Sequence, residues 1–438
     1  MKACFVSLGC DKNLVDTEHM MAILSSDGFM FVSEPEKADV VIINSCCFIS
    51  DALEESINTI IEIGSLKEEG HLKALILAGC LGQRFTEEVL AELPEVDGIL
   101  GTNSYDDLLQ IIHSALEGKK EVVKKDFSSL PSNAKGRYLT NVVPYTYLKI
   151  AEGCDKHCTY CIIPSIRGDY RSVPLEELVF EAKNLAVQGV KELNLVAQEV
   201  TLYGVDLYGK KSLTLLLDKL SEIEGIEWIR LLYCYPEEIT EELVAYMASN
   251  KKICHYIDMP IQHCSDEILG RMGRKTSKAD IEEKISLLRS KMPDIALRTT
   301  LICGFPGETE EHHKELLQFV KDASFDRLGC FSYSREEGTP AAKFENQIDD
   351  KIKDKWRDEV MELQQQIIFE TNESLVGQRL ECFVEGKVED GVYAARTYRD
   401  APEVDGYIFI ETNRELMSGD IVCCNVTGFK EYDLIGEL

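Results

Sequence analysis

Three short apolar runs near the start of the chain each end beside a cysteine. The runs are KACFVSL (residues 2–8), DVVIINS (39–45) and LKALILA (72–78). They precede Cys10, Cys46 and Cys80, respectively. Continuous apolar runs rich in β-branched residues are typical of parallel strands that are covered on both faces. A helix-like segment follows each run, so residues 1–118 are predicted to form a small α/β domain with a parallel sheet.

These three cysteines occupy matching places in successive strand–helix units. The carboxyl ends of parallel strands face one crevice in an open α/β sheet, so the three thiols are expected to converge there. Helix N-termini at that edge favour the negative charge of a thiolate-bound cluster. The alternative is that the three are buried structural thiols, as is expected for Cys47.

The rest of the chain changes character at three points. Residues 119–139 lack apolar periodicity and are rich in Ser, Pro, Asn and Gly, which predicts a linker. Residues 140–371 repeat a strand-then-helix pattern six times, which predicts an incomplete version of the eight-unit β/α barrel. Residues 372–438 carry short β-type runs separated by turn residues, which predicts a small antiparallel barrel.

The strongest local signal is KIAEGCDKHCTYCIIPSIRG, residues 149–168. Cys154, Cys158 and Cys161 form a C-x-x-x-C-x-x-C pattern directly after the first strand of the predicted partial barrel. Three thiolates in one loop suit an iron–sulfur cluster, and a cubane with three protein ligands leaves one iron free for substrate. The alternatives are a zinc loop completed by His157, or three packed cysteines.

Charge limits the choice of partner. The chain has 47 Lys and Arg against 77 Asp and Glu, a formal net charge of −30. Residues 377–438 hold 13 acidic and 6 basic residues, so 6 − 13 = −7. Such a surface repels phosphate backbones and favours a basic protein over RNA.

No run approaches the roughly 18 apolar residues of a membrane span, and a signal peptide is not expected. We therefore expect a cytoplasmic protein.

The cysteine loop resembles the motif of the radical S-adenosylmethionine (SAM) superfamily, with Tyr160 in the aromatic position before the last cysteine. The order of the predicted domains resembles the methylthiotransferase family over essentially the whole chain. Further matching stretches are Cys80–Leu81, QEVTLYGVDLYG (198–209), MPIQH (259–263), GFPGETEE (304–311) and APEVDGYIFI (401–410). The resemblance implies a second [4Fe–4S] cluster on the N-terminal cysteines and a TRAM domain at the C-terminus.

Two classes within this family compete: members that modify adenosine in tRNA, and RimO-type members that modify an aspartate of a ribosomal protein. SLGCDKNLVDTE resembles the RimO-type form, which usually reads SLGCPKNLVDSE, whereas the tRNA class typically has Gln-x-Asn after the cysteine. Asp11 replaces the usual proline and Thr17 the usual serine, and neither supplies a ligand. The acidic terminal barrel also disfavours tRNA and suits a basic ribosomal protein.

The resemblance implies β-methylthiolation of an aspartate in the small-subunit ribosomal protein S-twelve, carried out with two [4Fe–4S] clusters and SAM. In this scheme one SAM donates a methyl group to a sulfur at the N-terminal cluster. A second SAM is cleaved at the loop cluster to a radical that takes hydrogen from the aspartate β-carbon. An electron donor and a sulfur source, which the sequence does not identify, are also implied. The alternatives are a tRNA adenosine methylthiotransferase and a non-catalytic iron–sulfur carrier.

Residues at predicted strand ends are candidates for SAM contact. The candidates are Tyr160, Gln198, Glu199, Arg298 and the backbone near Gly304. For each of them, ordinary packing or surface pairing is the alternative. His263 also ends a strand and is expected to be structural. The remaining cysteines near barrel strands lack ligand spacing along the chain and are expected to be packing residues: Cys234, Cys254, Cys264, Cys303 and Cys330.

Overall fold

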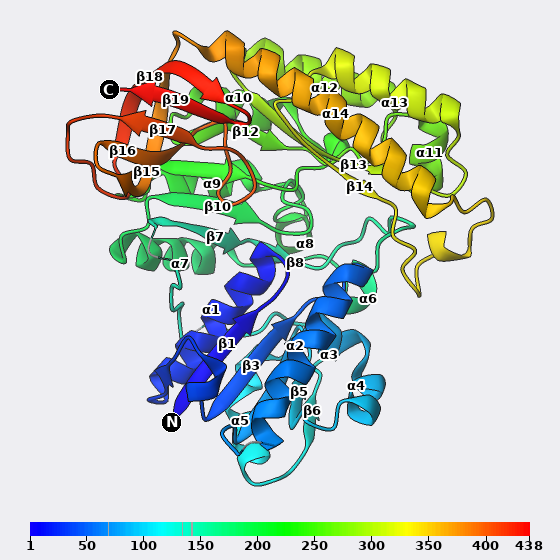
Figure 1. The fold of residues 1–438 in the computed structure, drawn as a ribbon, viewed down its shortest axis with the longest axis vertical. Helices are drawn as coiled ribbons and strands as arrows, with labels where there is room; N and C mark the ends of the chain where they lie inside the picture. The colour runs from blue at the N-terminus through cyan, green and yellow to red at the C-terminus, as the bar shows by residue number, and fades with distance from the viewer. Residues whose placement is uncertain (69, 134, 142) are drawn as a thin grey trace.

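A computed structural model describes residues 1–68, 70–133, 135–141 and 143–438. The chain forms an N-terminal sheet, a central sheet and a C-terminal barrel, which follow one another from blue to red in Figure 1. Residues 134 and 142, which fall in the predicted linker and at the start of the predicted partial barrel, lie outside the described residues. Among the described helices, none combines the length and the apolar character that a membrane crossing requires.

The N-terminal sheet has six parallel strands in the order β2-β1-β3-β4-β5-β6. Its strands are β1 (Lys2–Ser7), β2 (Met30–Phe31), β3 (Val40–Ser45), β4 (Ala74–Gly79), β5 (Gly98–Leu100) and β6 (Glu121–Val123). Its helices are α1 (Asp11–Ser26), α2 (Ser50–Glu68), α3 (Cys80–Arg84), α4 (Thr86–Glu92) and α5 (Leu108–Leu116). The three runs predicted as strands are β1, β3 and β4, which are direct neighbours in the sheet.

The three remaining strands of this sheet, β2, β5 and β6, were not predicted. Each has two or three residues, which is too short to show the apolar pattern of a strand. β6 lies inside the predicted linker 119–139 and forms the edge of the sheet beside β5. The N-terminal fold therefore continues past residue 118, and the other domain limits stay predictions.

The central sheet is an open sheet of six parallel strands in the order β14-β13-β12-β11-β10-β7. Its strands are β7 (Tyr145–Lys149), β10 (Glu192–Val196), β11 (Trp228–Leu231), β12 (Ile253–Asp258), β13 (Ala296–Cys303) and β14 (Arg327–Ser332). The helices between them are α6 (Ile163–Arg167), α7 (Leu175–Val187), α8 (Val205–Tyr208), α9 (Leu213–Ser221), α10 (Glu241–Ser249), α11 (Asp266–Arg271), α12 (Lys278–Lys291) and α13 (Glu310–Ala323). β8 (Ala151–Glu152) and β9 (Arg171–Ser172) form a separate small ribbon. The six predicted strand–helix units are confirmed.

The C-terminal part begins after the long helix α14 (Asp350–Leu375), which packs on α13 and β14. Its strands are β15 (Arg379–Glu389), β16 (Val392–Thr397), β17 (Ile408–Glu411), β18 (Ile421–Lys430) and β19 (Asp433–Glu437). They close into a barrel in the order β15-β16-β17-β19-β18. The fifth strand, β19, was missed, and it pairs parallel to β17, which makes one parallel contact in an otherwise antiparallel barrel.

The barrel and α1 cover one face of the central sheet, while helices cover the other. Phe383 and Ala401 from the C-terminal part and Val15 from α1 share an apolar cluster with residues of β7, β11 and β12. A buried ion pair supports this docking: Arg396 donates to Glu192 of β10 at 2.6 Å. The N-terminal and C-terminal parts are thus both seated on the central sheet.

Candidate metal centres

Cys10, Cys46 and Cys80 follow neighbouring strands of the N-terminal sheet. Cys10 is the N-cap of α1, Cys46 comes directly after β3, and Cys80 is the first residue of α3. Because β1, β3 and β4 are adjacent and parallel, the three thiols lie at one edge of the sheet. Cys46 and Cys80 are buried, while Cys10 is exposed. The structure therefore has a set of three sulfur donors there that is open on one side.

A glycine lets the first two of these loops touch. Gly9 has a φ of 94°, and a Cβ at this position would lie 2.7 Å from Cβ of Cys46. Only glycine adopts this backbone conformation and fits this space without strain. Asn13 connects the two loops by hydrogen bonds, because its Nδ2 donates to the carbonyl oxygens of Leu8 at 3.0 Å and Ser45 at 3.1 Å.

A buried arginine from the central part reaches this edge. Nη2 of Arg167, the last residue of α6, donates to Oδ1 of Asn13 at 2.6 Å and lies 3.7 Å from Sγ of Cys80. Its Nη1 pairs with Glu152 at 2.9 Å and with Asp16 at 3.3 Å. Sequence reasoning missed Arg167. The available signal was a lone cation in the short apolar segment that follows the cysteine loop.

Burial controls the protonation of these thiols. It raises the pKa of Cys80 to about 12 and also raises the pKa of Cys46, because the thiolate form loses its hydration. Arg167 acts in the opposite direction on the pKa of both cysteines. A bound metal centre supplies further positive charge and stabilises thiolates in such a place.

The second set of cysteines lies in the loop between β8 and α6. Cys154 and Cys158 are buried, and Cys161 is partly exposed. Sγ of Cys158 lies 3.9 Å from the hydroxyl of Tyr235. The loop turns at Gly153, whose φ is 80° and where a Cβ would lie 2.1 Å from a backbone oxygen. Burial raises the pKa of Cys154 to about 11 and of Cys161 to about 12.

Both sets of thiols suit a cluster better than a single ion. Among the described residues, three ligand-type side chains converge within 4.8 Å only elsewhere, on β13 and α13. Tetrahedral zinc holds its ligands at about 2.0–2.3 Å, which requires that tight spacing, whereas an iron–sulfur cluster spreads its thiolates more widely. His157, the nitrogen donor of the zinc alternative, is exposed to solvent. The donor sets therefore fit two iron–sulfur clusters.

The two sets lie on either side of one interface. Helix α3, which begins at Cys80, contacts α6, which follows the cysteine loop, and Figure 1 shows α6 between the N-terminal and central sheets. Ile162 and Ile166 pack into the apolar cluster that contains Cys47 and Leu81. The short helix α6 thus connects the loop of the second set to the edge that carries the first.

Two of the five SAM candidates carry polar atoms that lack a hydrogen bond among the described residues. Gln198 donates to Glu152 at 2.9 Å, while its Oε1 is buried and unpaired. Glu199 is fully buried; one of its oxygens accepts the Thr201 amide at 2.8 Å and the other is unpaired. Burial raises the pKa of Glu199 to about 7. Both residues have hydrogen-bonding capacity left for a ligand.

The other three candidates are already engaged by the protein. The Tyr160 ring packs edge-on against Phe305, with centroids 6.5 Å apart. Arg298 pairs with Asp258 at 2.9 Å and with Asp405 of the C-terminal part at 3.5 Å. The amide of Gly304 donates to the carboxylate of a nearby glutamate at 2.6 Å. SAM contact by these three residues stays a prediction.

Family models match three separate segments of the chain. Residues 2–101 match "Uncharacterized protein family UPF0004", residues 148–320 match the "Radical SAM superfamily", and residues 376–438 match the "TRAM domain". Their order agrees with the three parts of the fold. The fold and the two cysteine sets together define a radical SAM protein with an additional N-terminal domain and a TRAM domain.

Curated relatives cover the chain from end to end. "Ribosomal protein uS12 methylthiotransferase RimO" of Lachnoclostridium phytofermentans is 57% identical over 437 residues, which is 100% of this chain and 99% of the relative. The protein of the same name from Clostridioides difficile is 48% identical over 100% of this chain and 99% of its own length. The chain belongs to the RimO family of ribosomal protein uS12 methylthiotransferases.

Solved structures confirm the fold. The radical SAM methyltransferase TsrM from Kitasatospora setae, solved with cobalamin and a [4Fe–4S] cluster, matches with a TM-score of 0.58 at 14% identity, over 89% of this chain and 81% of that one. The cobalamin-dependent SAM radical enzyme OxsB matches with a TM-score of 0.52 at 13% identity, over 82% of this chain and 56% of that one. At this level of identity the likeness concerns the arrangement of sheets and helices alone.

Proposed function

We propose that this enzyme transfers a methylthio group to the β-carbon of an aspartate in ribosomal protein uS12. The observation that carries the proposal is the end-to-end identity of 57% with a curated uS12 methylthiotransferase. The charge of the chain supports it, because a net −30 suits a basic ribosomal protein and opposes tRNA. The reaction takes place where ribosomes are assembled, in the cytoplasm.

The cofactors of this proposal are two [4Fe–4S] clusters and SAM. Cys10, Cys46 and Cys80 would hold one cluster, and Cys154, Cys158 and Cys161 the other. When bound, the clusters and SAM supply the electron, the radical and the methylthio group. The protein itself must bring the target carbon close to both centres, since a radical transfer depends on short distances. The contact of α3, which begins at Cys80, with α6, which follows the cysteine loop, supports such an arrangement.

Arg167 links the N-terminal centre electrostatically to the central part of the chain. Its guanidinium is 2% exposed and lies between Cys80 on one side and Glu152 on the other. A thiolate-ligated cluster carries negative charge, and a buried cation next to it lowers the cost of that charge. Glu152 and Asp16 hold the guanidinium in place when the cysteines are neutral thiols.

The SAM contacts of this proposal lie at the carboxyl end of the central sheet. Gln198 and Glu199 offer the unpaired oxygens described above to the amino group of SAM, and Tyr160 stands beside the last cysteine of the loop. The backbone at Gly304 would approach the adenine. For Arg298 to meet the SAM carboxylate, Asp258 or Asp405 must release it, which makes it the most costly of the five contacts.

The test is mass spectrometry of uS12 from cells with and without this enzyme. The expected result is that uS12 gains the mass of one methylthio group in place of hydrogen on one aspartate, only when the enzyme is present. The matched control is the Cys154→Ala variant, which lacks one loop ligand. Modified adenosine in tRNA with unmodified uS12 would overturn the proposal in favour of the tRNA class.

A second readout separates an enzyme from a carrier of clusters. The anaerobic, reduced protein is mixed with SAM, and 5′-deoxyadenosine is measured. We expect the wild-type protein to release it and Cys154→Ala to release none. An iron-loaded protein that leaves SAM intact under these conditions would identify a non-catalytic carrier.

A further inference from the structure

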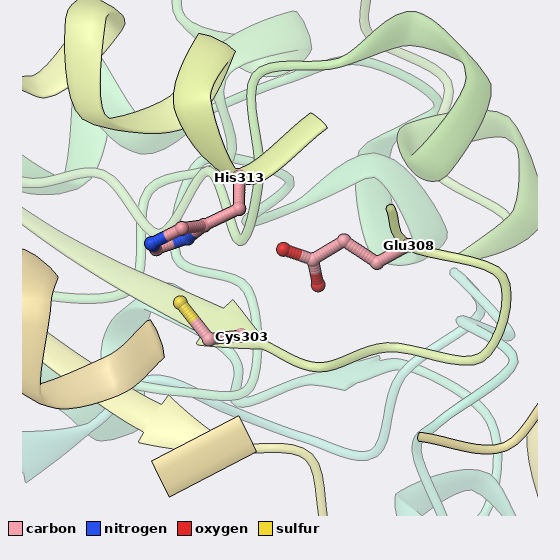
Figure 2. A group of neighbouring side chains, drawn as sticks. All are labelled: Cys303, Glu308 and His313. Atoms are coloured by element: carbon pink, nitrogen blue, oxygen red, sulfur yellow. The ribbon is translucent and has the colours of Figure 1, made fainter. Parts of the chain in front are cut away.

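A separate group of metal-ligand side chains lies buried at the end of β13 and shares no residue with either cysteine triad. Cys303, Glu308 and His313 place their sulfur, oxygen and nitrogen atoms within 4.8 Å of one another, and all three are buried. Figure 2 shows the Cys303 sulfur and the Glu308 carboxylate directed toward the His313 ring. The residues come from the last position of β13, the following loop and the first turns of α13.

A fourth donor lies next to them. Sγ of Cys330, on the neighbouring strand β14, is 3.4 Å from Sγ of Cys303, and the two cysteines form no disulfide. Cys303 and Cys330 are 27 residues apart along the chain, so spacing in the sequence did not reveal the pair. Both were expected to be packing residues, and their burial agrees with that role. A packing residue has apolar neighbours, however, whereas Cys303 lies beside Glu308 and His313.

The histidine is oriented as a metal ligand would be. Nε2 of His313 bonds to the carboxylate of Glu359 on α14 at 2.7 Å. Its other ring nitrogen, Nδ1, is buried and has no hydrogen bond among the described residues. A carboxylate on one ring nitrogen with the other nitrogen free is the arrangement that fixes a histidine for metal binding. The ring stacks on Trp356, with centroids 5.0 Å apart, which holds its plane.

The two carboxylate oxygens of Glu308 have different surroundings. Oε2 of Glu308 accepts the amides of Gly304 at 2.6 Å and Phe305 at 3.0 Å. Oε1 is buried without a hydrogen bond among the described residues and lies 3.4 Å from Nε2 of His263. A buried carboxylate oxygen left in this state is costly unless a cation compensates it.

We propose that Cys303, Glu308 and His313, with Cys330 beside them, bind one zinc ion. Two thiols, one imidazole and one carboxylate form a set of four that suits tetrahedral zinc. The thiols and imidazole disfavour magnesium and calcium, and zinc stands above iron in affinity for such donors. The ion would tie β13, α13 and β14 together beneath α14. The site is structural, and through Glu308 it also holds the loop at Gly304, whose backbone is proposed above to approach the adenine.

The experiment measures zinc in the iron-loaded holoenzyme. The protein is reconstituted anaerobically so that the six cluster cysteines are occupied, then given one equivalent of zinc and freed of excess. Elemental analysis is expected to find about one zinc per chain. The double variant Cys303→Ser/His313→Gln should lose at least about tenfold of that zinc and keep its iron. The control Cys254→Ser, a buried cysteine on β12, should keep both metals.

A second variant keeps the test valid if the double variant does not fold. Glu359 is 38% exposed at its side chain and bonds to His313 of the site at 2.7 Å. Glu359→Gln should fold, keep its iron and bind zinc about tenfold more weakly. Zinc X-ray absorption should show sulfur at about 2.3 Å together with nitrogen or oxygen. An all-sulfur shell, a zinc-free holoenzyme, equal zinc in wild type and Glu359→Gln, or a Cys303–Cys330 disulfide in the anaerobic protein would overturn the proposal.

Discussion

The two cysteine triads present similar donors but are built in different ways. Cys154, Cys158 and Cys161 lie within eight residues of one loop, so the local chain alone brings them together. Cys10 and Cys80 are separated by 70 positions and meet only because β1, β3 and β4 are neighbours in one sheet. The loop triad is therefore a local feature of the chain, and the N-terminal triad is a property of a folded domain.

This difference predicts which of the two centres loses its iron first when the fold is destabilised. Any change that loosens the N-terminal sheet separates its three cysteines, whereas the loop triad keeps its spacing. Iron at the N-terminal centre should thus follow the stability of the sheet, and iron at the loop centre should not.

The largest effect is expected from removing one triad at a time. The Cys10→Ala/Cys46→Ala/Cys80→Ala variant should keep about four of about eight irons per chain and still cleave SAM, but it should leave uS12 unmodified. The Cys154→Ala/Cys158→Ala/Cys161→Ala variant should also keep about four irons and lose SAM cleavage. Iron analysis and 5′-deoxyadenosine release measure the two outcomes. Full iron retention in the first variant would refute the N-terminal centre.

The next largest effect is expected at Arg167, which reaches the N-terminal triad from the central part of the chain. Arg167→Met removes a positive charge that neutralises the buried carboxylates of Glu152 and Asp16. We expect this loss to lower the free energy of unfolding by about 3–5 kcal/mol. Iron at the N-terminal centre should fall with it. Urea unfolding and iron analysis check this result.

The control for this variant is Arg171→Met. Arg171 donates to main-chain carbonyl groups, including those of Phe127 and Arg167, and within the described part of the chain it pairs with no buried carboxylate. Its loss should cost clearly less than that of Arg167. If both variants lose the same free energy of unfolding, the ion pairs of Arg167 with Glu152 and Asp16 do not stabilise the fold beyond what Arg171 contributes.

The sequence predicted those parts of the fold that repeat or that are long. The three strands that lead to Cys10, Cys46 and Cys80 carry continuous apolar runs, and the six central strands recur in a regular strand-then-helix pattern, so both are visible without a structure. The strands that were missed, such as β6 and β19, are short or lie next to turns. Their pairing depends on neighbours that are distant in the chain, such as β5 and β17.

The same limit applies to the sites. The cysteine pattern of the loop has fixed spacing and could be found directly. Arg167, Asn13 and the group around His313 could not, because their partners are distant in sequence and are brought together by side-chain packing. Arg167 bonds to Asn13 across 154 positions, for example. Spacing along the chain identifies local sites, and only the folded structure shows the others.

A smaller effect is expected from acid. His19 lies buried in α1, the helix that Cys10 begins, and burial lowers its pKa from 6.5 to about 4. The unfolded chain takes up this proton near pH 6.5 and the folded protein does not, so stability is full above pH 6.5 and falls as the pH drops toward 4. The loss is about 3 kcal/mol in total, with roughly 2 kcal/mol of it by pH 5.

His19→Gln removes this proton uptake and should flatten the pH dependence of urea unfolding between pH 7 and 5. N-terminal iron should also be lost at a lower pH in the variant than in the wild type, while loop iron is unaffected by the substitution. An unchanged pH profile in His19→Gln would show that other groups cause the acid sensitivity.

The smallest effect is expected from one methyl group at the N-terminal centre. Gly9 and Gly28 both have positive φ, 94° and 82°, so alanine strains the backbone at either position. A Cβ at Gly9 would lie 2.7 Å from Cβ of Cys46, whereas a Cβ at Gly28 meets nothing within 4 Å. Gly9→Ala should therefore destabilise by about 1–3 kcal/mol more than Gly28→Ala, as overpacking does. Urea unfolding measures that difference, and iron analysis should find N-terminal iron reduced in Gly9→Ala alone. Equal iron in the two variants would mean that the loop carrying Cys10 tolerates displacement, and that the N-terminal triad depends less on the sheet than its geometry indicates.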